Sequence, residues 1–156
     1  MSAIMYEADM SSATATESVV LTVTGPIALN LTLSDLSRFL RQSVRAKDEL
    51  GKESVFKGVR LTEILLAAGV KFGKELRGKW LADYLLVETE DGYRVVFALP
   101  ELDPTFGEVD ILLADRRDSE PLEGREGTLR LIIPGEKRYA RWARRVVSLQ
   151  IRSVKE

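Results

Sequence analysis

The residues with the clearest chemical potential follow an apolar segment near the end of the chain. Residues 127–133 (G-T-L-R-L-I-I) are apolar and rich in strand-forming residues apart from Arg130. The next segment is cationic and aromatic, and contains Lys137, Arg138, Tyr139, Arg141, Trp142, Arg144 and Arg145. Guanidinium groups bind carboxylate and phosphate with paired hydrogen bonds. A buried strand that leads into such a loop is therefore a candidate anion site.

Each of these residues also has a simpler explanation. Arg130 can lie on the solvated face of a half-exposed strand or pair with a carboxylate such as Asp91. Arg141 can be an ordinary surface charge, and Trp142 is expected to bury its ring as a core anchor. The cations could instead bind nucleic-acid phosphates, but several acids nearby in the sequence would repel those phosphates: Glu120, Glu123, Glu126 and Glu136. Neutralisation of these acids is the preferred interpretation, and no nucleic-acid partner is expected.

The composition excludes several kinds of catalytic site. The 156 residues carry a net charge of −1 and contain neither cysteine nor histidine. Thiolate nucleophiles and the usual zinc ligands are therefore absent, and so is the side chain that most often titrates near neutral pH. The carboxylates between positions 91 and 110 match no metal-binding loop. We predict no catalytic residue and no metal ligand.

The first half of the chain predicts two amphipathic helices. Residues 1–18 are small, polar and aperiodic, which is typical of a flexible tail. Val19–Thr24 is a predicted strand, and Thr32 and Asp35 form a capping pattern ahead of leucines at helical spacing. Residues 41–57 are highly charged, which favours a surface loop with an edge strand at 54–57. A second helix is predicted from Leu61 to Ala68, because Gly69 can end it in a left-handed conformation.

The second half predicts strands. Tyr84–Thr89 and Tyr93–Leu99 flank Asp91-Gly92, which is a hairpin signal because both turn positions favour positive φ. Further strands are expected at 110–115 and around Val147, Leu149 and Ile151, with a charged loop at 115–127. Residues 19–156 contain no repeat or interior linker, so we expect a single domain of the α+β class. No run is long enough to span a membrane, and the first 18 residues lack the features of a secretion signal. A soluble protein is expected, in an unknown compartment, and export would require that a signal had been removed.

Several phrases of the sequence together resemble one known family. They are F-K-G-V-R-L-T-E-I-L-L-A-A-G-V (56–70), D-G-Y (91–93), I-L-L-A (111–114), E-P-L-E-G-R-E-G-T-L-R-L-I-I-P-G (120–135) and R-W-A-R-R-V (141–146). In this order they resemble the molybdopterin-binding domain of the sulfite oxidase family, over about residues 19–154. The resemblance implies a mixed, β-rich α+β fold with partly barrel-like sheets and short peripheral helices. It also implies a pterin cofactor held by arginines, for which Arg130, Arg141 and Arg138 are the candidates.

The chain departs from this family at the metal. The resemblance implies a cysteine ligand to molybdenum within residues 41–57, and that segment has none. Oxygen ligands from Ser43, Asp48 or Ser54 are conceivable, but no local pattern selects one. We therefore predict a small, stand-alone, non-catalytic binding module for a small anionic ligand or a protein partner. A molybdenum-pterin oxidoreductase and a purely structural, partner-binding domain stay open as alternatives.

Overall fold

The computed structural model describes residues 17–107 and 109–154. Most of the predicted tail lies outside the described residues. Of the two tail residues that are described, Glu17 accepts a hydrogen bond from the backbone N–H of Ser34 at 2.9 Å. Among the described helices, none is long and apolar enough to cross a membrane.

The first sheet pairs the first described strand of the chain with the last. Its five strands lie in the order β2-β1-β10-β5-β6. Their bounds are β1 Val19–Thr24, β2 Leu29–Thr32, β5 Tyr84–Thr89, β6 Arg94–Ala98 and β10 Val146–Arg152. β1 pairs with β10 in parallel, whereas the other neighbours are antiparallel. The strands predicted at 19–24 and 84–89 are confirmed to the residue.

The second sheet is built on a long hairpin. β3 (Arg41–Lys47) pairs with β4 (Glu53–Arg60), β4 pairs with β7 (Leu112–Arg117), and β7 pairs with both β8 (Glu120–Pro121) and β9 (Arg130–Ile132). The prediction of a surface loop over 41–57 is therefore wrong, whereas the strand predicted within it at 54–57 is found as part of β4, which lies between β3 and β7 and not at the edge of the sheet. From Ser43 onward β3 alternates exposed and half-buried residues, and its exposed residues, Ser43, Arg45 and Lys47, are all polar, so the strand lacks an apolar run.

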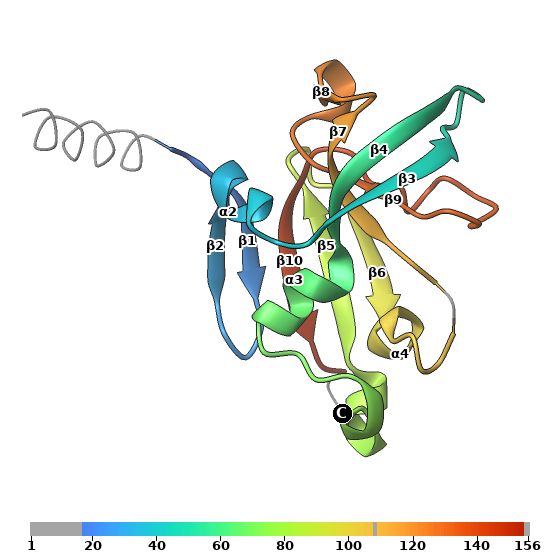
Figure 1. The fold of residues 1–156 in the computed structure, drawn as a ribbon. Coiled ribbons are helices and arrows are strands. Elements are labelled where there is room, and N and C mark those ends of the chain that lie inside the picture. Colours follow the sequence, from blue (N-terminus) through green and yellow to red (C-terminus); the bar gives the residue numbers. More distant parts are fainter. Residues whose placement is uncertain (1–16, 108, 155–156) are drawn as a thin grey trace, which may run out of the picture.

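Short helices lie around the sheets (Figure 1), and their bounds are α2 Leu33–Ser37, α3 Leu61–Ala67, α4 Leu99–Leu102, η1 Gly73–Glu75, η2 Gly78–Ala82 and η3 Gly124–Glu126. The predicted Thr32–Asp35 capping box is present. In α2 only Leu36 is buried and Leu33 is exposed, while Leu40 is exposed and lies beyond the end of the helix, so the predicted apolar stripe is shorter than expected. The second predicted helix is confirmed, with Gly69 beyond its end at φ +87°.

One hydrophobic cluster joins the two sheets. It includes Leu21, Val87 and Leu149 from the first sheet and Phe56 and Leu131 from the second, all fully buried. Within the described residues each sheet is open, so the expected partly barrel-like closure is not found. The α+β class with short peripheral helices is confirmed.

The hairpin turn between β5 and β6 differs from its prediction. Only Gly92 has a positive φ, at +87°, and the backbone N–H of Gly92 donates to Thr89 at 3.0 Å. The turn therefore contains Glu90 as well as Asp91-Gly92, and the single glycine allows the strand to resume as in a bulged three-residue loop.

Candidate anion-binding pocket

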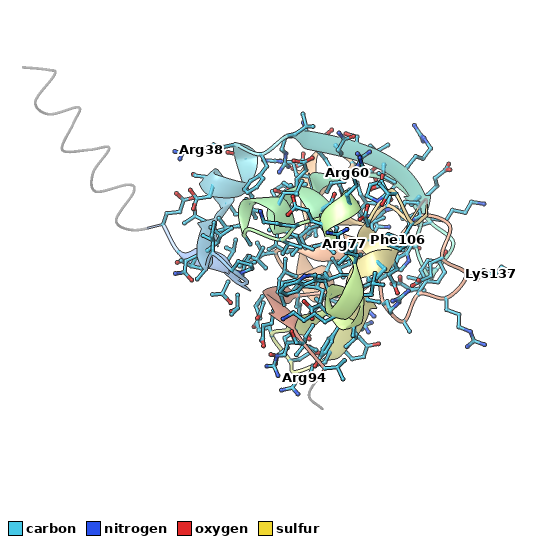
Figure 2. The ribbon with its side chains drawn as sticks, turned by 90° about the horizontal axis from the view of Figure 1, so that it is seen from below. Arg38, Arg60, Arg77, Arg94, Phe106 and Lys137 are labelled. Carbon is cyan, nitrogen blue, oxygen red and sulfur yellow. The ribbon has the colours of Figure 1, made fainter. Side chains whose placement is uncertain are left out.

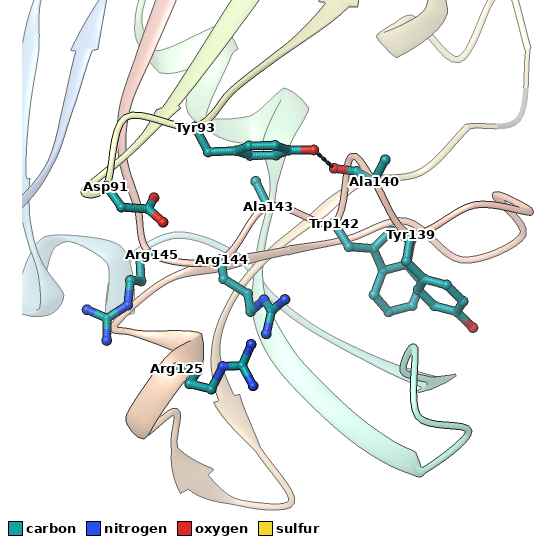
Figure 3. Close-up of a pocket in the computed structure, with 9 residues that line it drawn as sticks. All are labelled: Asp91, Tyr93, Arg125, Tyr139, Ala140, Trp142, Ala143, Arg144 and Arg145. Carbon is teal, nitrogen blue, oxygen red and sulfur yellow. Dashed lines mark hydrogen bonds between the residues drawn. The ribbon is translucent and has the colours of Figure 1, made fainter.

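The η3 turn, the turn between β5 and β6 and the loop between β9 and β10 line a polar pocket of about 420 Å³. Its lining consists of Asp91, Tyr93, Arg125, Tyr139, Ala140, Trp142, Ala143, Arg144 and Arg145. Figure 3 shows the guanidinium groups of Arg125 and Arg144 pointing toward one another across this space. Two like charges that face each other in a pocket favour an anion between them.

Arg125 reaches the pocket through a tight glycine turn. It lies within η3, between Gly124 at φ +62° and Gly127 at φ +72°. A Cβ atom on Gly127 would lie 2.6 Å from Cγ of Arg145 and 2.9 Å from its Cα. Only glycine therefore allows the two loops to approach this closely.

Arg145 is held in an unusual backbone conformation. Its φ is +57°, and a non-glycine residue in this region is uncommon and costs on the order of 1 kcal/mol. Its backbone N–H donates to the carbonyl of Glu126 at 3.0 Å, and its Nη2 donates to the carbonyl of Gly124 at 3.1 Å. These bonds fix the Arg145 backbone against the η3 turn. Such strain is often found at functional sites.

Two tyrosines hold the opposite wall. The Tyr93 hydroxyl donates to the carbonyl of Ala140 at 2.6 Å, and the Tyr139 hydroxyl donates to the carbonyl of Lys47 at 3.0 Å. The Tyr139 ring meets Trp142 edge to face, with centroids 4.7 Å apart. The loop is thereby tied to β3 and to the turn between β5 and β6, which preorganises the pocket.

The pocket arginines are only weakly neutralised by protein carboxylates. Arg144 lies 4.0 Å from Glu49, and Arg145 lies 3.7 Å from Glu90, both beyond hydrogen-bonding distance. Within the described part of the chain, Arg125 has no carboxylate within 4.0 Å. The hydrogen bond from the Thr89 hydroxyl lowers the pKa of Asp91, so the one acid in the lining is ionised at neutral pH.

Two buried donors near the pocket lack an acceptor. Nε1 of Trp142 and Nε of Arg130 are buried and make no hydrogen bond within the described residues. The Arg130 guanidinium carbon lies 5.8 Å from the centroid of the Trp142 ring, so the two residues are neighbours. Trp142 is only 4% exposed, which confirms it as a core anchor. A buried donor without an acceptor usually indicates a bound water or ligand that accepts its hydrogen bond.

Arg130 lies outside the lining of this pocket. It is 1% exposed, and its guanidinium donates to Glu126 at 2.7 Å and to Glu49 at 2.6 Å. Glu126 also accepts from Arg117 at 3.0 Å, and Arg117 bonds Asp48. Arg130 is therefore paired, as one interpretation expected, but its partners are Glu126 and Glu49 and not Asp91. Its role in binding a cofactor stays a prediction.

The other two predicted arginines also lie outside the lining. Arg141 donates to Glu101 at 2.8 Å, to Glu136 at 2.6 Å and to the carbonyl of Val96 at 3.0 Å. Its guanidinium carbon also lies 4.3 Å from the Phe97 ring centroid. Arg138 is exposed. The expected neutralisation by the cationic cluster is confirmed for Glu136, which pairs with Arg141, whereas Glu126 pairs with Arg117 and Arg130, outside that cluster.

The candidate oxygen ligands have structural roles or lie apart. Ser54 accepts a hydrogen bond from Nε of Arg117 at 2.9 Å, and Asp48 binds the same guanidinium. Ser43 lies on an exposed position of β3. Among the described residues there is no group of three His, Cys, Asp or Glu side chains that could hold a metal ion. The Glu108 carboxylate lies outside the described residues.

Sequence reasoning missed the residue that best defines the pocket. Arg144 and Arg145 belong to the cationic cluster, but Arg125 was part of a segment read only as a charged loop. The signal that could have found it is the pair of glycines at 124 and 127, because they allow the turn that brings Arg125 to the cluster.

Comparison with solved structures shows where this fold occurs. The crystal structure of the sulfane dehydrogenase SoxCD from Paracoccus pantotrophus is similar, with a TM-score of 0.66 and 23% sequence identity. The similarity covers 87% of this chain and 39% of that chain, so this chain spans well under half the length of its match. No protein-family model and no curated protein matches the sequence. At this identity the similarity shows the fold alone.

Proposed function

We propose that this chain is a non-catalytic binding module whose ligand is a small anion held by Arg125, Arg144 and Arg145. The observation that carries the proposal is that the guanidinium groups of Arg125 and Arg144 point toward one another in a polar pocket whose lining also includes Arg145. Within the described residues, Arg125 has no carboxylate within 4.0 Å. The carboxylates that pair with Arg144 and Arg145 lie at 4.0 Å and 3.7 Å, so a ligand with more than one negative oxygen can displace these contacts and bind two guanidinium groups at once.

The pterin cofactor implied by the family resemblance fits this chain only in part. Its phosphate matches the charge of the arginine pocket. The metal does not fit, because the chain contains no cysteine and because Asp48 and Ser54 already bind Arg117. We therefore derive no redox step from these residues.

A molybdenum-pterin oxidoreductase is the second candidate, because the fold is similar to that of a sulfane dehydrogenase. It has a direct test. Protein produced in a host that makes the pterin should carry molybdenum at close to one atom per chain if this candidate is right. Protein without molybdenum and without pterin fluorescence would exclude it.

The binding proposal is tested by titration calorimetry at low salt with inorganic phosphate, pyrophosphate, sulfate and adenosine monophosphate. Arg125→Gln and Arg144→Gln should each lower the affinity for the best anion by about tenfold or more, because a hydrogen bond to a charged group contributes about 1.5–3 kcal/mol. Arg38→Gln is a matched control, because Arg38 is 80% exposed and lies at the end of α2, outside the pocket. The control should bind like the original protein.

Two results would overturn the proposal. One is the absence of binding heat with all four anions. The other is binding that falls equally in Arg38→Gln, since that would indicate a general effect of net charge. Arg138→Gln and Arg141→Gln complete the set, because reduced affinity in these variants would support the cofactor-binding residues predicted from the sequence.

A further inference from the structure

A second hollow, of a different chemical character, lies where η1 and η2 pack beside the end of β10. It has a volume of about 320 Å³ and is lined mainly by apolar residues: Pro26, Val70, Leu76, Trp80, Leu99 and Ile151. These residues are distinct from those of the arginine pocket. We propose that this groove docks an acidic segment of a partner protein, which inserts one bulky apolar side chain between Trp80 and Leu76.

The apolar surface at the groove is unusually exposed. Trp80 is 49% exposed and Leu81 beside it is 42% exposed. Nζ of Lys79 lies 4.9 Å from the centroid of the Trp80 ring and covers part of one face. Exposed aromatic residues at a concave apolar surface are typical of the anchor positions of protein interfaces.

The segment that supplies Leu76 and Trp80 to the groove, residues 71–80, carries several exposed cations, here called the rim. Lys71, Lys74, Arg77 and Lys79 are all exposed, and η1 supplies one acid, Glu75, which pairs with Lys71 at 3.5 Å. Within the described part of the chain, the other three cations have no carboxylate within 4.0 Å. A partner segment with carboxylates on either side of its apolar anchor would therefore complement this rim.

The remaining acid at the groove is not available to neutralise the rim. Asp83 is only 8% exposed, and its carboxylate accepts a hydrogen bond from the Ser153 hydroxyl at 2.8 Å. Figure 2 views the molecule from the end that carries η2, with Arg77 near the middle of the view and Lys137 at its edge. Lys137 therefore serves as a cation remote from the groove.

The groove is also preorganised. The backbone N–H of Gly73 donates to the Asp103 carboxylate at 2.6 Å, and the backbone N–H of Leu99 donates to the carbonyl of Asp83 at 3.0 Å. Asp103 is 1% exposed and connects η1 to the loop after α4. A site held in this way loses little conformational entropy on binding. Its concave shape suits a single inserted side chain better than a flat lipid surface.

The test begins with a library of random peptides of about twelve residues displayed on phage and selected on the whole chain. Enriched peptides should be acidic and contain Trp, Phe or Leu. A synthetic copy of the best peptide should then bind Trp80→Ala about 30-fold more weakly than the original protein. The variant Lys74→Glu/Arg77→Glu/Lys79→Glu should lose binding, and Lys137→Glu should not.

Several results would overturn the proposal. They are enrichment of neutral or basic peptides, no enrichment above that obtained on the triple charge variant, and unchanged affinity in Trp80→Ala. If the protein binds no peptide but sediments with vesicles that contain equal amounts of phosphatidylcholine and phosphatidylserine, the surface binds a membrane instead, and the proposal is overturned. Because Trp80 and the three cations are exposed, these variants are expected to fold. Anion binding by Arg125 and Arg144 serves as an independent readout, so failure of one proposal does not imply failure of the other.

Discussion

Replacement of Arg130 by methionine should strongly destabilise the protein. Arg130 is 1% exposed and is held by two carboxylates, whose side chains are 17% exposed for Glu126 and 31% for Glu49. Removing one partner of a buried ion pair costs about 3–5 kcal/mol. We expect the lower end of this range, because Glu126 keeps Arg117 at 3.0 Å and Glu49 keeps Arg144 at 4.0 Å.

Methionine is the suitable replacement because its unbranched side chain can still pack against Trp142. A loss of about 3 kcal/mol in a chain of this size corresponds to a fall in melting temperature of about 6–12 °C. The free energy of unfolding should be measured by urea denaturation at neutral pH, with linear extrapolation. The free energy of unfolding of Arg130→Lys should lie between those of the original protein and Arg130→Met, because lysine keeps the charge but cannot bind two carboxylates with the planar geometry of a guanidinium.

The opposite result has a clear meaning. If the free energy of unfolding of Arg130→Met is within about 0.5 kcal/mol of that of the original protein, the ion pairs of Arg130 do not stabilise the fold, and the prediction is refuted. If, in addition, the variant loses anion binding, Arg130 acts on the ligand as the sequence resemblance implies. A matched control is Arg45→Met, because Arg45 is 68% exposed and its pair with Glu53 is 4.0 Å long.

Three further changes test other parts of the structure. Gly58→Ala should cost more than about 2 kcal/mol in urea denaturation, because its Cβ would lie 1.9 Å from the carbonyl oxygen of Leu113 on the neighbouring strand; unchanged stability would contradict the close strand contact. Arg141→Ala should cost only about 1 kcal/mol, because the side chain is 32% exposed and its ion pairs are screened by solvent; a loss above about 3 kcal/mol would show that it is a core residue. Asp103→Asn should weaken the fall in the free energy of unfolding as the pH is lowered. Burial alone would raise the pKa of Asp103, but hydrogen bonds from Gly73 and Thr105 lower it below 3.8 on balance. The stability from this carboxylate is therefore complete above pH 3.8 and is lost as the pH falls through the lower folded-state pKa. If the free energy of unfolding of the variant falls with pH as in the original protein, the ionised Asp103 carboxylate does not stabilise the fold.

Local features of the sequence account for much of the secondary structure. The strands at 19–24 and 84–89 and the helix before Gly69 were predictable because strand propensity, helical spacing and a left-handed glycine act between near neighbours. The β3–β4 hairpin was missed because near neighbours do not determine it. β4 pairs with β7, which is distant in the sequence, and β3 pairs with β4, so this charged segment is recognised as strands only once the sheet is known.

The candidate site was less predictable than the fold. The sequence alone establishes that this chain supplies no cysteine or histidine, and it locates the cationic cluster near the end of the chain. It does not establish which cations are neutralised, because partners can be distant: Arg130 bonds Glu49, 81 positions away.

Only the tertiary structure separates the structural arginines from those left for a ligand. Arg130 and Arg141 lie within hydrogen-bonding distance of two carboxylates each, while Arg125 and Arg144 face each other because Gly127 lets the η3 turn contact Arg145. The physical reason is that the strength of an ion pair depends on distance and burial in the folded chain. Residue type and spacing therefore determined that an anion site was plausible, and the packing of two loops decided where it lies.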